Sequence, residues 1–206
     1  HVPEEYSKTK PPVPEMDNDT VRLKTQINII SIDSIDTSKM IVALTLQLQV
    51  RWVDNRLTYR NLIPNDKNFI PVEIAGNIWL PLENIVFENS DIEETYEDKI
   101  KEIIVNASTP IGIDDDSYED SVYNGTSNIL EMTQIFKVKY KCVFDLFSFP
   151  FDWENCKFAL KMRRLEKLTA ILVAADPAVI YKGPTSIHQF NIGNMMNGTN
   201  QTKEDT

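Results

Sequence analysis

The clearest signal in the sequence is an alternation of apolar and polar residues between positions 40 and 52. The apolar positions are Met40, Val42, Leu44, Leu46, Leu48, Val50 and Trp52, and Thr45, Gln47, Gln49 and Arg51 stand between them. A helix would scatter these apolar residues around its axis, whereas a strand places alternate residues on one face. The pattern therefore predicts a long strand with one face in a core and the other in contact with water.

Further segments of the same kind lie on both sides of this strand. Residues 21–29, 136–142 and 156–162 alternate, residues 169–175 are apolar, and residues 187–192 suggest a last short strand. Turn-forming residues separate the segments, so residues 54–68 read as turns and loops and residues 107–128 as a polar insertion. No long helical period is present. We therefore predict an all-β sandwich.

The first 19 residues differ from the rest of the chain because four prolines stand among charged residues. Proline lacks a backbone N–H group and fixes φ, so this segment reads as an extended arm. A chain of 206 residues fits one domain of the sandwich class. We expect an N-terminal arm over residues 1–19 and a single β-sandwich domain over residues 20–206.

Composition excludes several classes of function. The chain has 21 Lys and Arg against 31 Asp and Glu, a net charge of −10, which argues against a nucleic-acid partner and suits a surface that attracts cations. Six glycines form neither the dinucleotide nor the P-loop pattern, and two His with two Cys fit no zinc spacing. The acidic residues near position 115 do not have EF-hand spacing, which favours a solvated loop. We expect no cofactor and no metal.

The spacing of asparagines points to an extracellular location. Five N-x-Ser/Thr sequences, where chance gives about two, make these asparagines candidates for glycosylation: Asn18, Asn106, Asn124, Asn197 and Asn200. The alternative is coincidence in polar loops. An even number of cysteines agrees with an oxidising compartment.

The two cysteines, Cys142 and Cys156, enclose 13 residues that are unusually rich in aromatic side chains. A disulfide between them would tie the ends of two predicted strands, and closing a loop of ~15 residues stabilises a protein by about 3 kcal/mol. So many aromatic residues in a loop should be buried against something. Two interpretations stay open: the loop folds back onto its own core, or it is a docking surface for another domain.

This loop resembles the signature loop of the Cys-loop receptors, the pentameric ligand-gated ion channels. The similarity rests on the cysteine spacing, on Asp145, and on Phe149-Pro150-Phe151-Asp152. Trp52-Val53-Asp54-Asn55-Arg56-Leu57 and Ile78-Trp79-Leu80-Pro81 resemble two further motifs of the family, and the resemblance covers about residues 20–193. It implies an extracellular twisted β-sandwich of the immunoglobulin-like kind with about ten strands, five copies of which form a ring of identical or mixed subunits.

The resemblance also implies a function. Small-molecule agonists of the neurotransmitter type would bind between neighbouring subunits, and the signature loop would pass the binding signal to the protein's own transmembrane domain. In this chain the coupling residues would be Phe149, Pro150, Phe151 and Asp152. The protein would be a membrane receptor with this domain on the extracellular side and would not be an enzyme. We expect the natural chain to continue into a last strand and a membrane domain.

The ligand-binding positions of the family can be carried over one by one. They fall on Gln47, Phe87, Glu88, Glu131, Thr133, Met162, Arg163 and Tyr181. No Trp stands near Met162, although an ammonium ligand is bound best over an aromatic face, so a typical acetylcholine site is not expected. Arg163 would instead suit a carboxylate. The alternative roles are core packing for Phe87, solvated positions for Gln47 and Glu131, and a salt bridge for Arg163.

Two other functions compete with the receptor interpretation. A soluble, secreted ligand-binding protein similar to the acetylcholine-binding proteins would have the same fold, but those proteins have a hydrophilic signature loop, so the aromatic loop favours a receptor. A secreted hydrolase could use an acid pair such as Asp152 and Glu154. These two residues are better explained as turn and signature residues.

Overall fold

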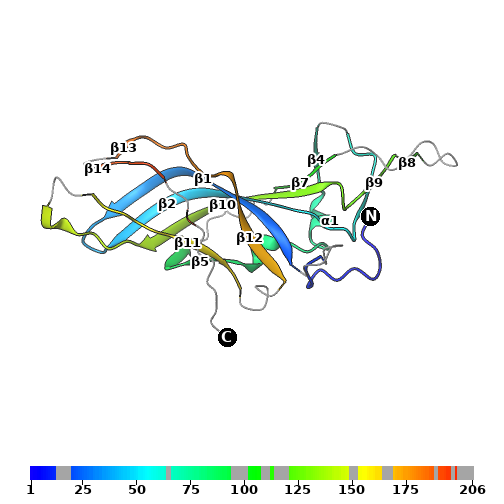
Figure 1. Cartoon of the computed structure of the whole chain (residues 1–206), viewed down its shortest axis with the longest axis horizontal. Coiled ribbons are helices and arrows are strands. Elements are labelled where there is room, and N and C mark those ends of the chain that lie inside the picture. The colour runs from blue at the N-terminus through cyan, green and yellow to red at the C-terminus, as the bar shows by residue number, and fades with distance from the viewer. Residues whose placement is uncertain are drawn as a thin grey trace.

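The computed structural model describes residues 1–12, 20–63, 66–93, 102–107, 112–113, 121–148, 153–163, 169–187, 190–195 and 198. This part of the chain is mostly strand, as the alternation of apolar residues predicts. Figure 1 shows an elongated molecule whose longest strands run side by side. The helices are short: α1 (Val72–Ala75), η1 (Pro81–Asn84) and η3 (Leu146–Ser148). None of the helices in the described residues has the length and apolar composition needed to cross a membrane.

The main sheet has seven strands. Their order is β12-β1-β2-β10-β7-β4, and β6 also pairs with β10. The pairs are antiparallel except β1 with β12, which run parallel with Val21 opposite Ala170. The strands are β1 (Val21–Asp36), β2 (Ile41–Trp52), β4 (Lys67–Phe69), β6 (Ser90–Glu93), β7 (Glu102–Asn106), β10 (Ile129–Lys141) and β12 (Ala170–Tyr181).

Three smaller sheets complete the described structure. β5 pairs with β11, β13 pairs with β14, and β9 lies between β3 and β8. Their bounds are β3 (Thr58–Arg60), β5 (Ile85–Glu88), β8 (Gly112–Ile113), β9 (Ser121–Asn124), β11 (Ala159–Met162), β13 (Ser186–Ile187) and β14 (Phe190–Asn191).

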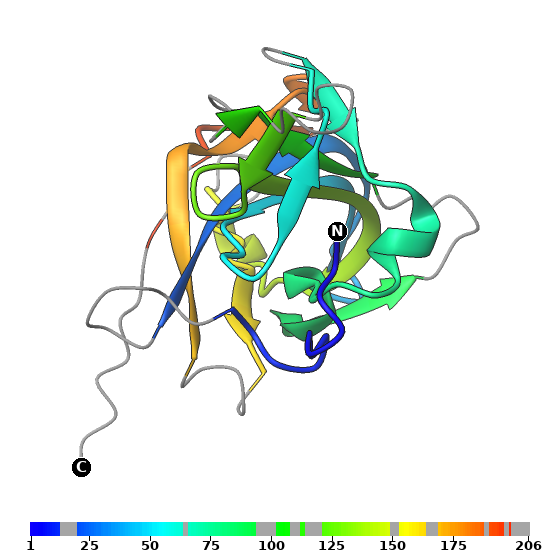
Figure 2. The same cartoon turned by 90° about the vertical axis from the view of Figure 1, so that its right-hand side faces the viewer.

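The core lies between the main sheet and the β5–β11 pair. Leu46, Leu48 and Val50 on β2 are completely buried, so the alternate face of this strand faces inward as predicted. From the opposite side Phe87 packs edge-on against Phe136, with 5.1 Å between ring centroids. The end-on view in Figure 2 shows the long strands curving around this shared interior. Two sheets with a common apolar interior confirm the predicted β-sandwich.

The short strands differ from the sequence-based expectation. Residues 54–68, expected to be turns and loops, include β3 and the start of β4, and residues 107–128, expected to be an insertion, include β8 and β9. The strand expected from residue 156 begins at Ala159, and the last expected strand is the hairpin of β13 and β14. Strands of two to four residues are too short to show alternation. Pairing with a neighbouring strand, and not a local sequence pattern, makes these segments strands.

The N-terminal arm, as far as it is described, is folded onto the sandwich. Residues 1–12 contain two turns, closed by the Tyr6 N–H donating to the Pro3 carbonyl and the Lys10 N–H donating to the Ser7 carbonyl, and are not simply extended. The Lys8 ammonium donates to the carbonyl of Gly76 over 3.2 Å. The bond from Lys8 ties the arm to the loop after α1.

A partly buried polar cluster of Tyr6, Asp54, Arg56 and the backbone of Trp79 fixes the arm. The Tyr6 hydroxyl donates to Asp54 Oδ2 over 2.7 Å and accepts from Trp79 N at 2.8 Å and from Arg56 Nη2 at 3.0 Å. The Arg56 guanidinium also lies 4.1 Å from the centre of the Tyr6 ring. Asp54 is fully buried and forms an ion pair with Arg56. We call this group the Tyr6 cluster.

Candidate functional site

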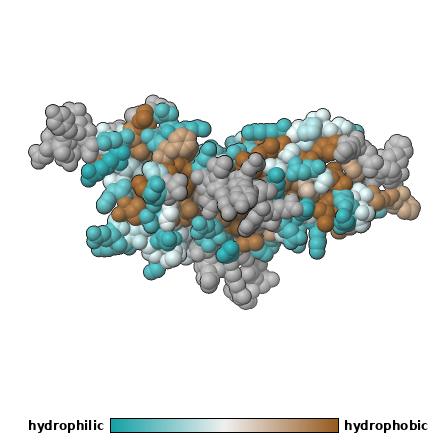
Figure 3. Space-filling model, turned by 180° about the vertical axis from the view of Figure 1, so that it is seen from behind, coloured by the Kyte–Doolittle hydropathy of each residue, from teal (hydrophilic) through white to brown (hydrophobic). Residues whose placement is uncertain are grey.

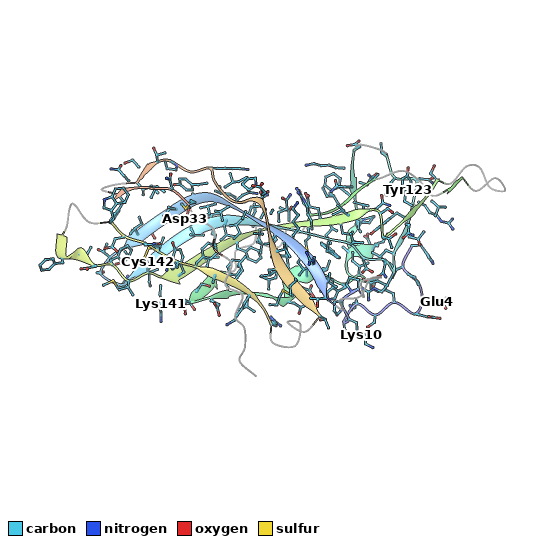
Figure 4. The ribbon with its side chains drawn as sticks, in the orientation of Figure 1. Glu4, Lys10, Asp33, Tyr123, Lys141 and Cys142 are labelled. Carbon is cyan, nitrogen blue, oxygen red and sulfur yellow. A yellow bond between two sulfur atoms is a disulfide. The ribbon has the colours of Figure 1, made fainter. Side chains whose placement is uncertain are left out.

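The disulfide-closed loop lies at one end of the molecule. Cys142 follows the last residue of β10 and is bonded to Cys156, with 5.2 Å between their Cα atoms. Figure 4 shows Cys142 and Lys141 toward this end and Tyr123 and Glu4 toward the other. The Cys142 N–H donates to the carbonyl of Met40, just before β2, which holds the start of the loop against the main sheet. The bond between the cysteines is therefore confirmed.

The described residues of this loop are divided between the core and the surface. Phe144 is buried, whereas Val143, Phe147 and Trp153 are 83%, 97% and 92% exposed. Figure 3 shows apolar atoms at the tip of the end that carries η3. Large apolar side chains at such exposure are typical of an interaction surface. The expected coupling residues Phe149, Pro150, Phe151 and Asp152 lie outside the described residues.

A second feature is a cavity of about 350 Å³ on the polar face of the main sheet. Three of the residues predicted to bind ligand, Gln47, Glu131 and Thr133, line it together. Strand register brings them there, because Thr133 pairs with Gln49 and Glu131 with Arg51. The other lining residues are Gln26, Asn28, Gln49, Arg51, Lys67, Phe69, Glu102, Ile104, Ile180 and Lys182.

Hydrogen bonds order the side chains of this cavity. Arg51 Nε donates to Glu131 Oε2 over 2.5 Å, and Arg51 Nη2 donates to Gln49 Oε1 over 3.2 Å. Asn28 Nδ2 donates to Gln47 Oε1 over 3.1 Å. This face therefore offers a ligand amide groups and a paired charge, together with the charged side chains of Lys67, Glu102 and Lys182. The arrangement suits binding by hydrogen bonds.

Four other predicted site residues lie on or beside the β5–β11 pair. Phe87 and Met162 are buried in the core of the single chain. Glu88 Oε1 accepts from Lys161 Nζ across these two strands over 2.6 Å. The side chain of Arg163 is exposed, and its backbone N–H donates to the carbonyl of Asn84. Within one chain, the structure does not bring these four residues together with Gln47, Glu131 and Thr133, so their role in ligand binding stays a prediction.

Tyr181 ends β12 close to the cavity. Its hydroxyl donates to the carbonyl of Pro184 over 2.7 Å, and its ring covers Gly183. Its chain neighbours Ile180 and Lys182 line the cavity. Tyr181 therefore shapes the segment beside the cavity, and direct contact with a ligand stays a prediction.

Sequence reasoning missed seven polar residues of the cavity: Gln26, Asn28, Arg51, Gln49, Lys67, Glu102 and Lys182. A signal for the first three was present, because Gln26 and Asn28 occupy the polar positions of residues 21–29 and Arg51 those of residues 40–52. Antiparallel pairing of the two strands puts Asn28 opposite Gln47 and Gln26 opposite Gln49. Register is a tertiary property, so alternation alone did not give it.

Two of the five glycosylation candidates can be placed. Asn106 ends β7 and is exposed, whereas Asn124 ends β9, is partly buried and accepts from the backbone N–H of Thr126. Asn18, Asn197 and Asn200 lie outside the described residues. Among the described residues no group of three or more His, Cys, Asp or Glu side chains is arranged to hold a metal ion.

Comparison with known proteins gives a consistent result. Residues 1–202 match the family model described as the neurotransmitter-gated ion-channel ligand binding domain. Over 145 residues the chain is 28% identical to the gamma-aminobutyric acid receptor subunit beta of Caenorhabditis elegans. The aligned segment covers 69% of this chain and 22% of that protein. Over 155 residues it is 24% identical to the neuronal acetylcholine receptor subunit alpha-5 of Rattus norvegicus. That aligned segment covers 74% of this chain and 28% of the relative. The matched segment is thus about a quarter of the length of either relative.

Proposed function

Because the chain belongs to the neurotransmitter-gated ion-channel ligand-binding domain family, which is a family of receptor domains and not of enzymes, we propose that it is the extracellular ligand-binding domain of a pentameric ligand-gated ion channel. In this proposal residues 20–206 form the domain and residues 1–19 the arm, of which the described residues 1–12 are folded onto the domain. Agonists bind between subunits on the cell surface, and binding opens a channel in the membrane.

The observation that carries the proposal is the apolar end of the disulfide-closed loop. Val143, Phe147 and Trp153 are almost fully exposed although each is large and apolar. A secreted protein with the same fold would leave this surface in water, which is unfavourable by about 25 cal/mol per Å² of apolar area. A transmembrane domain of the same polypeptide would cover it. This supports a receptor rather than a soluble binding protein.

A matched pair of substitutions tests the proposal in the full-length protein expressed in oocytes. Acetylcholine and gamma-aminobutyric acid, taken from the names of the two relatives, are applied first to the unaltered protein. Phe147→Ser should lower the maximal current at least severalfold without a comparable change in the concentration that half-saturates binding. Ile63→Ser, at another exposed apolar position away from the loop, serves as the control and should leave the current unchanged.

Two outcomes would contradict the proposal. The first is secretion of the natural full-length product as a soluble protein, which would establish the alternative of a secreted ligand-binding protein. The second is an equal effect of the Phe147 and Ile63 substitutions on the maximal current. That result would mean that the exposed end of the loop has no special part in coupling.

A further inference from the structure

We propose that Met40 is a site of oxidation by peroxides, and that its conversion to the sulfoxide loosens the attachment of the disulfide-closed loop to the main sheet. Met40 ends the turn between β1 and β2 and directly precedes Ile41, the first residue of β2. Such a modification depends only on the folded chain and not on the proposed receptor function. It is supported by the exposure of the side chain and by the two hydrogen bonds that Met40 accepts from the loop.

Met40 holds the start of the disulfide-closed loop with both its backbone and its side chain. Its carbonyl accepts from the Cys142 N–H over 2.9 Å, and its Sδ accepts from the Phe144 N–H over 3.4 Å. Phe144 is buried, whereas Val143 and Phe147 on either side of it are exposed. The bond to Sδ therefore lies at the point where the loop is attached to the core.

The backbone of Met40 has a conformation that is unusual for a methionine. Its φ is 57°, in the left-handed region, where residues other than glycine are uncommon. Residues in this region persist where surrounding contacts hold them there. The two bonds to the loop are contacts of this kind, so a change at the sulfur also affects the backbone bond to Cys142.

The side chain of Met40 is open to a small oxidant. It is 37% exposed, close to the 39% of Met195, whereas Met132 and Met162 are 0% and 4% exposed. Both cysteines of the chain form the disulfide, so no thiol competes for the oxidant. Among the described methionines, oxidation is therefore expected at Met40 and Met195 before the two buried ones.

The reaction transfers one oxygen atom from the peroxide to the sulfur. An electron pair of the Met40 sulfur attacks one oxygen of hydrogen peroxide, and the O–O bond breaks as the S–O bond forms. The proton of the attacked oxygen moves to the departing hydroxide, which leaves as water, so the sulfur loses two electrons and the peroxide gains them. A thioether sulfur is only a weak acceptor, and the sulfoxide is a polar group. Its sulfur is partly positive and no longer accepts from the Phe144 N–H, while its oxygen turns toward water.

The first experiment measures which methionines react, with hydrogen peroxide as the probe and the purified protein as the sample. Peptide mass spectrometry over time gives an oxidation rate for each methionine. Met40 should react at least about tenfold faster than Met132 and Met162, because these two side chains are shielded from the oxidant. Met195 is the exposed comparison and should react within about threefold of Met40.

The second experiment measures amide hydrogen exchange by NMR before and after oxidation. We expect the Phe144 N–H to exchange about three- to tenfold faster in the oxidised protein, as the loss of one weak hydrogen bond predicts. The Lys141 N–H, which donates to the carbonyl of Asn89, is the internal reference and should keep its rate.

Two variants separate Met40 from the other exposed methionine. Met40→Leu keeps an apolar side chain of similar size without the sulfur, so its Phe144 N–H should exchange quickly from the start and peroxide should not change that rate. Met195→Leu removes the residue of matched exposure and should keep the full response. The unaltered protein provides the decisive comparison even if Met40→Leu fails to fold.

The proposal is overturned if Met40 reacts no faster than Met132, or if oxidised Met40 leaves the exchange of the Phe144 N–H unchanged. Slower exchange would also overturn it, because the sulfoxide oxygen would then have taken over the hydrogen bond and tightened the loop. Loss of the response in Met195→Leu would assign the effect to the wrong methionine and has the same consequence.

Discussion

At the scale of single residues, the Tyr6 hydroxyl connects the arm to the sandwich through three hydrogen bonds. Tyr6→Phe removes this oxygen, so the Trp79 N–H loses its acceptor and buried Asp54 keeps only the bonds that Arg56 donates. We expect the free energy of unfolding to fall by about 1–3 kcal/mol, measured by urea denaturation. Tyr181→Phe, which removes a single exposed bond to Pro184, is the control and should cost less than about 1 kcal/mol. Equal effects of the two changes would contradict this account of the Tyr6 cluster.

Tyr140 gives a prediction about alkaline pH. Burial raises its pKa to about 12, above the ordinary value of 10. A raised pKa in the folded state means that the folded protein keeps the proton after the unfolded chain has lost it. The stabilisation that Tyr140 contributes is therefore fully present below pH 10 and is lost as the pH rises toward 12, by about 1.4 kcal/mol per pH unit.

Urea unfolding at pH 9, 10 and 11 measures this loss, and Tyr140→Phe is the comparison that isolates it. Burial also raises the pKa values of Tyr6 and Tyr59, so the variant should flatten the decline only in part. If the free energy of unfolding of Tyr140→Phe fell between pH 10 and 11 as steeply as that of the unaltered protein, Tyr140 would have an ordinary pKa in the folded state.

Residue-level prediction from sequence covered only part of the candidate site. Gln47, Glu131 and Thr133 line one cavity because strand register brings them together, and their binding of a ligand stays a prediction. Asn28 was missed because only strand register brings it opposite Gln47 and into the lining of the cavity. Asp54 and Arg56 were noted as part of a motif, whereas their link to Tyr6 spans about fifty residues.

At the scale of elements, the turn after β9 packs very closely against the turn after β2. A Cβ atom on Gly125 would lie 2.0 Å from the backbone oxygen of Asp54, and the Gly125 N–H donates to the carbonyl of Leu57. Gly125→Ala must therefore push the two turns apart, and we expect a loss of about 1–3 kcal/mol in the free energy of unfolding. Gly198→Ala has open space around it and is the matched control. A loss below about 0.5 kcal/mol for Gly125→Ala would contradict the close packing.

The disulfide gives a second prediction at this scale. It joins the end of β10 to the segment before β11 and closes a loop of about 15 residues, so replacing both cysteines with serine should lower the free energy of unfolding by about 3 kcal/mol. Thermal unfolding of the serine variant with and without dithiothreitol measures the effect. Only the unaltered protein should respond to the reductant. A response of the serine variant would show that the reductant acts elsewhere.

Long and short elements differed in how well the sequence predicted them. β1, β2 and β10 each have twelve or more residues, enough for alternation to stand out. β3, β8 and β13 have two or three residues and exist because a neighbouring strand supplies hydrogen bonds. Patterning identified β2 and parts of β1 and β10, and among the short strands it indicated only the last hairpin, whereas β3 and β8 were missed.

At the scale of the whole molecule, the three most exposed large apolar side chains of the described residues, Val143, Phe147 and Trp153, all lie on the disulfide-closed loop. Phe147→Ser combined with Trp153→Ser should lower self-association of the isolated chain, because both side chains are more than nine-tenths exposed. Sedimentation velocity across a concentration series measures this. Ile63→Ser combined with Ile74→Ser changes two exposed apolar residues elsewhere and is the control. An equal decrease in both variants would show that general hydrophobicity, and not this loop, drives association.

The continuity of β10 has a mechanical consequence. One strand carries Glu131 and Thr133 in the cavity and leads directly into Cys142, a path of about 35 Å at the usual rise per residue. It is hydrogen-bonded to β2 along its whole length, so it cannot stretch or buckle easily. A small displacement at one end therefore reaches the other as a shift or tilt of a rigid lever, and no chain of side-chain rearrangements is needed in between.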